Sequence, residues 1–141
     1  MKKHTHLFLV LLTSLALCTA SCNKSGKNGQ TNDTQAATEL LVEDFNKQVP
    51  QKINEDLTLQ GYKLEGKTLV CTYLVSPAYL NRMDAAKTRD NLKTGLSQEK
   101  NLKLVKYLIA DSMSMRYVYN DSTKTLSFDF STQELSQLTS K

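Results

Sequence analysis

Histidine, cysteine and tryptophan are scarce in this sequence. Tryptophan is absent, and the 141 residues include only two histidines and three cysteines. Both histidines, His4 and His6, lie within the first few residues. The rest of the chain therefore has no imidazole, which excludes Ser-His-Asp and Cys-His catalysis, histidine-bound zinc and a histidine pH switch from that part.

The start of the chain is patterned differently from the rest. Lys2 and Lys3 precede an apolar run from Leu7 to Leu17, and small residues follow the run. A basic start, a short apolar run and small residues before a cleavage site are typical of a signal peptide. The run is also shorter than the ~20 residues that a membrane-spanning helix requires. We expect residues 1–21 to be removed as a signal peptide rather than kept as a transmembrane helix.

The segment Thr19-Ala20-Ser21-Cys22 resembles the lipobox of bacterial lipoproteins, in which small residues precede a cysteine that is acylated with fatty acids such as palmitate. The resemblance implies that Cys22 becomes the mature N-terminus and anchors the protein to a membrane. Asn23 stands where an aspartate marks inner-membrane retention, so the resemblance implies the outer membrane, with the domain facing the periplasm. Ordinary cleavage after Ala20, which leaves Cys22 as a free thiol, is the alternative.

Removing this segment changes the chemistry of the remainder. The loss of Lys2 and Lys3 leaves 16 of the 18 basic residues against 14 acidic ones, a formal balance of +2. Nucleic-acid binding normally requires a concentrated basic face, so we expect no nucleic-acid partner. If Cys22 is acylated, Cys71 is the only thiol left and no intrachain disulfide can form. Stability must then come from packing.

The mature chain divides into a tether and one domain. Residues 22–37 comprise Cys22 and a run rich in Asn, Gly, Ser and Thr without large apolar side chains. Such a composition cannot bury a face, so it predicts a flexible tether. Residues 38–141 carry the apolar patterning and suffice for one small domain.

Hydrophobic periodicity predicts the elements of this domain. They are, in order, a helix from Thr38 to about Val49, strands over 57–64 and 67–76, helical segments over 77–98 and 99–109, a hairpin over 113–130 and a short helix over 131–140. In the first helix, Ile53 continues the apolar stripe beyond Pro50, where the helix is expected to end or kink. The order α-ββ-α(α)-ββ-α indicates an α+β fold in which two antiparallel β-hairpins form a roughly four-stranded sheet with helices on one face.

Alternation places four side chains of the second hairpin on one face: Met113, Met115, Tyr117 and Tyr119. Methionine adapts its shape and tyrosine offers a polar tip, so these residues are candidates to face an apolar or peptidic ligand. The alternative is that they form the inner face of the sheet. Cys71 lies between apolar neighbours with no histidine to activate it, and is predicted to be a buried, unreactive thiol.

Basic side chains gather in the predicted helical region. They are Lys87, Arg89, Lys93, Lys100, Lys103 and Lys106. This cluster is a candidate to meet anionic lipid headgroups beside the anchor. Asp84, Asp90 and Glu99 interrupt it, which favours a solvated helix surface instead.

The sequence contains no GxSxG motif, phosphate-binding glycine loop or metal-ligand spacing, so we predict no catalytic residue, metal or cofactor. It predicts a lipid-anchored cell-envelope protein with a non-catalytic binding or assembly-support role. Its expected partners are the membrane, through the anchor at Cys22, and an envelope protein. One alternative is a carrier that holds a small apolar or peptidic ligand against the Met/Tyr sheet face. The other is a His-free hydrolase built on carboxylates.

Overall fold

A computed structural model describes residues 32–140 of the chain. The predicted signal peptide, Cys22 and most of the predicted tether lie outside the described residues. Within them the elements are, in order, α1 (Asn32–Asn46), β1 (Gln51–Asn54), β2 (Leu57–Glu65), β3 (Thr68–Val75), α2 (Pro77–Arg82), α3 (Ala85–Leu96), α4 (Glu99–Ala110), β4 (Ser114–Asn120), β5 (Thr125–Phe130) and α5 (Thr132–Leu138). None of these helices has the length and apolar character that crossing a membrane requires.

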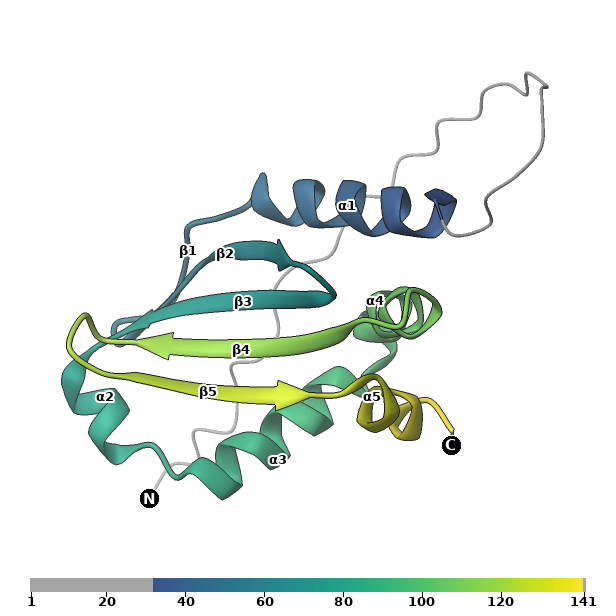
Figure 1. Cartoon of the computed structure of the whole chain (residues 1–141). Helices are drawn as coiled ribbons and strands as arrows, with labels where there is room; N and C mark the ends of the chain where they lie inside the picture. Colours follow the sequence, from purple (N-terminus) through teal and green to yellow (C-terminus); the bar gives the residue numbers. More distant parts are fainter. Residues whose placement is uncertain (1–31, 141) are drawn as a thin grey trace, which may run out of the picture.

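The strands form one mixed sheet in the order β1-β2-β3-β4-β5. Neighbouring strands are antiparallel except β3 and β4, which run parallel from the pair Thr68↔Ser114 to the pair Leu74↔Asn120. The connection through α2, α3 and α4 permits this pairing, because it carries the chain back to the end of the sheet where β3 begins. In Figure 1 α1 lies alongside β2, and α2 and α3 lie beyond β5. The predicted α+β fold is confirmed.

The sheet has five strands where the sequence predicted roughly four, because Gln51–Asn54 form β1. Gln51 pairs with Leu59, and the amide of Asp56 donates to the side-chain oxygen of Asn54 (2.9 Å) in the intervening turn. Ile53, predicted on the stripe of the first helix, lies in this strand. The helix prediction was wrong there because a four-residue strand with one apolar side chain gives too little alternation to recognise.

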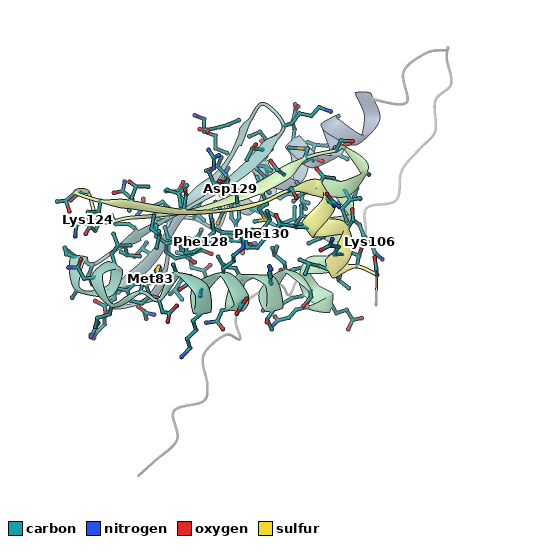
Figure 2. The ribbon with its side chains drawn as sticks, turned by 60° about the horizontal axis from the view of Figure 1, so that its bottom comes forward. Met83, Lys106, Lys124, Phe128, Asp129 and Phe130 are labelled. Carbon is teal, nitrogen blue, oxygen red and sulfur yellow. The ribbon has the colours of Figure 1, made fainter. Side chains whose placement is uncertain are left out.

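The inner face of the sheet packs against the helices and forms the core. The largest side chains with under 2% exposure come from both layers: Phe130 and Leu69 from strands, and Leu96, Leu108 and Leu135 from helices. Figure 2 shows Phe128 and Phe130 on the side of β5 that faces α3, with Asp129 on the opposite side. This alternation places the polar side chains of β5 on the second face of the sheet.

Two polar contacts hold α1 against the rest of the domain. Thr38 is fully buried and donates from Oγ1 to Oδ2 of Asp111, at the C-terminal end of α4 (2.5 Å). The side-chain amide of Asn46 accepts a hydrogen bond from the Tyr62 N–H (2.8 Å) and donates one to the Tyr62 carbonyl (2.7 Å). The helix begins at Asn32, six residues before the predicted start at Thr38, so its first residues occupy the end of the predicted tether.

Local sequence signals position the other elements as expected. Ser76 is the N-cap of α2, where its hydroxyl accepts from the Tyr79 N–H, and Ser131 and Glu134 form a capping box at the start of α5. Gly66 has a φ of 57° in the turn between β2 and β3, a conformation that favours glycine. The pairing of β2 with β3 shifts register between Leu59 and Gly61, where the strand has a bulge or similar irregularity.

Candidate functional site

The four candidate ligand-facing residues are buried on the inner face. Met113, Met115, Tyr117 and Tyr119 are 4%, 2%, 9% and 6% exposed. Met115 pairs in register with Phe130, and Tyr117 pairs with Phe128. The structure therefore brings all four together with the aromatic side chains of β5, beneath the helices.

Five tyrosines lie around the centre of the inner face and are called the tyrosine cluster: Tyr62, Tyr73, Tyr79, Tyr117 and Tyr119. The ring of Tyr73 stacks on Tyr119 with centroids 5.0 Å apart, and its centroid lies 6.5 Å from that of Tyr117. Tyr117 and Tyr119 are buried, whereas the other three are partly exposed. The cluster therefore has a buried floor and a partly exposed rim.

Four phenols of this cluster and the thiol beside them have pKa values raised by burial, so they stay protonated at neutral pH: Tyr62, Tyr73, Tyr117, Tyr119 and Cys71. Burial raises the pKa of Tyr62, Tyr73 and Tyr117, and nearby Cys71 adds to the shift. Burial also raises the pKa of the Cys71 thiol to about 12, although hydrogen bonds with Tyr73 and Tyr62 act in the opposite direction. Cys71 is 1% exposed, which confirms its predicted burial. The cluster can exchange hydrogen bonds with a ligand but offers no thiolate nucleophile.

The second face of the sheet carries an apolar strip across its central strands. This open-face strip consists of Val70, Thr72 and Leu74 of β3 and Val118 of β4, which the register places on one side. Leu74 is 46% exposed, unusually high for a large apolar side chain of a central strand. Ion pairs border the strip, with Arg116 Nε 2.6 Å from Asp129 Oδ1 and Lys63 Nζ 3.2 Å from Glu65 Oε1. An apolar centre with a charged rim is the usual arrangement of a protein-binding surface.

The predicted basic cluster is divided in the structure. Arg89 donates to Oε1 of Glu134 (2.6 Å), and its guanidinium carbon lies 4.6 Å from the centre of the Phe130 ring. Arg89 therefore ties α3 to α5 and β5. Hydrogen bonding from the Ser131 backbone and from Arg89 lowers the pKa of the Glu134 carboxyl. The lysines of α4 remain on the surface.

Several acidic side chains have local structural contacts. Asp44 pairs with Lys47 (2.7 Å), and Asp56 accepts a hydrogen bond from the Ser76 hydroxyl (2.6 Å). Among residues 32–140, no three histidine, cysteine, aspartate or glutamate side chains are grouped to hold a metal ion. These contacts assign structural roles to the carboxylates, and carboxylate-based hydrolysis stays a prediction.

Sequence reasoning missed the open-face strip. Alternation already indicated that Val70, Thr72 and Leu74 share the second face of a central strand. It did not show that Val118 extends this face, because that requires the parallel pairing of β3 with β4. The long helical connection between the two strands was the one available signal, since parallel neighbours need such a crossover.

These elements define an α+β domain with an open, five-stranded mixed sheet and helices packed against its inner face. The model of a family described as "Putative quorum-sensing-regulated virulence factor" (QSregVF) matches residues 30–135, and the chain belongs to this family. No curated protein matches the sequence.

Two solved structures share the fold. One is the crystal structure of a putative secreted protein from Pseudomonas aeruginosa, with a TM-score of 0.63 and 19% identity over 78% of this chain and 99% of that one. The other is the type II secretion system pilotin AspS from Vibrio cholerae, with a TM-score of 0.52 and 12% identity over 75% of this chain and 99% of that one. At these identities the likeness shows the fold.

Proposed function

We propose that this protein is a lipid-anchored envelope protein that supports the assembly of another envelope protein by binding it without catalysis. The acyl chain at Cys22 holds it in the outer membrane, with the domain facing the periplasm. The open-face strip is the binding surface for the partner.

The exposed central pair of parallel strands carries this proposal. Parallel strands are normally covered on both faces, because their apolar side chains point both ways. The helices cover the inner face of β3 and β4. On the second face Leu74 is exposed, and Thr72 and Val118 are partly exposed. Val70 is only 7% exposed, so the strip meets solvent mainly at its Leu74 end. A partner protein that packs on the strip completes the burial and leaves the ion pairs at the rim.

The comparisons support an envelope role. The chain belongs to a family described as a quorum-sensing-regulated virulence factor, and a putative secreted protein and a type II secretion system pilotin share its fold. The partner is therefore sought among envelope proteins rather than among nucleic acids or soluble metabolites.

Crosslinking in intact envelopes tests the binding surface. Leu74→Lys places a charge in the centre of the strip, and Val118→Thr adds a hydroxyl with little change of shape. We expect Leu74→Lys to reduce the crosslinked partner at least 10-fold and Val118→Thr to reduce it less, with thermal unfolding little changed. The matched control is Leu40→Lys on α1, because Leu40 is the other exposed large apolar side chain in the part of the chain that the structure describes, at 63%. Loss with Leu40→Lys and retention with Leu74→Lys would contradict the proposal.

The anchor has a separate test. Replacing Cys22 with serine removes the acylation site, so we expect the protein to move from the membrane fraction to the soluble periplasmic fraction. The measurement is fractionation followed by immunoblotting, with Cys18→Ser as the control that keeps the lipobox cysteine. Membrane retention of the Cys22→Ser protein after a high-salt wash would refute acylation as the anchor.

A ligand carrier is the second candidate, and the tyrosine cluster favours it. Tyr62, Tyr73 and Tyr79 are partly exposed and border the buried Met/Tyr residues, so a small ligand can hydrogen-bond at the rim. Native mass spectrometry of protein taken from envelopes tests this alternative. A small molecule that co-purifies reproducibly supports the carrier, and protein free of ligand but crosslinked through the open-face strip supports the assembly role.

A further inference from the structure

Three lysines on α4 form an exposed basic ridge. Lys100, Lys103 and Lys106 recur every three residues, so they lie along one side of the helix, and all three are exposed. None of the ion pairs among the described residues involves them. We call this surface the α4 ridge. Its charge is available to a partner.

The carboxylates near the ridge leave its charge largely uncompensated. Glu99 lies in the first turn of α4, four residues before Lys103, a spacing that makes the two side chains neighbours on the helix surface, but no ion pair joins them among the described residues. Asp111 at the other end of the helix accepts the hydrogen bond from Thr38 and lies near the Nζ of Lys67, which donates to the Asp111 carbonyl (3.2 Å). In the middle of the helix, Lys103 and Lys106 are exposed to solvent, and no acidic residue lies between them in the sequence.

The chain enters the domain on the same side. Figure 1 shows the N-terminal end of α1 above α4, and the Thr38–Asp111 hydrogen bond joins the two helices there. Residues 23–31 separate Cys22 from the start of α1, a stretch that reaches at most roughly 35 Å when extended. An anchor at Cys22 therefore keeps this side of the domain within reach of the membrane surface.

We propose that the α4 ridge docks on an anionic phospholipid surface and orients the domain on the membrane. That the domain lies beside a membrane rests on the Cys22 anchor of the proposed function. The affinity of the α4 ridge for anionic lipid does not depend on that anchor. Because the open-face strip lies on the sheet and the ridge lies on the helical layer, docking through α4 leaves the strip free for the protein partner.

Vesicle binding of the non-acylated protein measures the ridge alone. The Cys22→Ser chain that begins at residue 22, without the apolar run, is mixed with phosphatidylcholine vesicles that contain phosphatidylglycerol, and with pure phosphatidylcholine vesicles. We expect binding only to the anionic vesicles, weakening as salt is added. Changing Lys100, Lys103 and Lys106 together to glutamine should lower the binding constant about 100-fold, since each lysine near such a surface contributes about 5-fold.

A second triple variant controls for total charge. It changes Lys52, Lys63 and Lys124 to glutamine, which removes the same charge from the strand side of the domain. Figure 2 shows Lys106 and Lys124 at opposite ends of the molecule. We expect this control to bind anionic vesicles within about 3-fold of the parent, because its lysines lie away from the docked helix and screening limits their contribution. Equal losses in both variants, or no loss in the α4 variant, would overturn the proposal.

The two proposals fail separately. If the ridge is only a solvated helix surface, vesicle binding is unaffected by the α4 substitutions while Cys22→Ser still releases the protein from envelopes. If the anchor is wrong, Cys22→Ser changes nothing in the envelope fraction, while the α4 variant still loses vesicle binding.

Discussion

Phe130→Ala is expected to lower the free energy of unfolding by about 3–5 kcal/mol. Phe130 is fully buried at the end of β5, and its ring meets Tyr117 edge-on with centroids 6.0 Å apart. The guanidinium of Arg89 lies over the same ring. Removing the ring leaves a cavity and also takes away the surface on which Arg89 rests. A single domain of this kind has about 5–15 kcal/mol of stability, so the variant loses a large share of it.

Thermal and urea unfolding followed by circular dichroism measure this loss. Phe130→Leu is the graded variant, because it keeps most of the apolar volume and should cost about 1–2 kcal/mol. Leu40→Ala on the exposed side of α1 is the control and should fall within about 0.5 kcal/mol of the parent. Equal stability of Phe130→Ala and Leu40→Ala would mean that β5 does not pack as described.

Leu135→Ala is expected to cost about 2–5 kcal/mol and to loosen α5 before the rest of the domain unfolds. α5 spans Thr132–Leu138, too short to be stable in isolation. Leu135 is the side chain that it buries fully. The capping box of Ser131 and Glu134 satisfies the first turn but does not attach the helix to the core. Leu135 is the buried apolar attachment, and two polar contacts assist it: Arg89 donates to Glu134 (2.6 Å), and the Thr132 hydroxyl donates to the Met113 carbonyl (2.8 Å).

Amide hydrogen exchange distinguishes this local effect from a global one. In Leu135→Ala, protection should fall first in residues 132–138, while β3 and β4 keep most of theirs. Ser131→Ala serves as the comparison, because loss of the cap should cost only about 1 kcal/mol. Uniform loss of protection across the sheet and α5 would show that the helix is not a separately opening unit.

Elements with their own start and stop residues could be predicted from the sequence. Ser76 followed by Pro77 marks the beginning of α2, and the Ser131/Glu134 capping box marks α5, because each signal acts through contacts within one turn. β1 could not be predicted in this way. Its four residues carry one apolar side chain, Ile53, and they become a strand only because β2 is available for pairing.

The same limit applies to the candidate site. Alternation correctly placed Met113, Met115, Tyr117 and Tyr119 on one face, but the choice of which face the helices cover depends on the packing of several elements. The α4 lysines were visible as charges from the start. The sequence did not show that Arg89 differs from these lysines in having a structural role. That role depends on its contact with Glu134, and the two residues lie far apart in the sequence.

The hydrogen bonds of Asn46 also affect where a strand from another molecule could be added to this sheet. β1 pairs with β2 only as far as Leu59, so the Tyr62 peptide would otherwise present its N–H and carbonyl at an unprotected strand edge. The carboxamide of Asn46 satisfies both groups, much as the peptide of an additional strand would. A strand from a second molecule must displace the end of α1 before it can pair there, which protects this edge from self-association. The free margins that remain are β1, which has only four residues, and β5, which has six, so β5 offers the longer edge for strand addition.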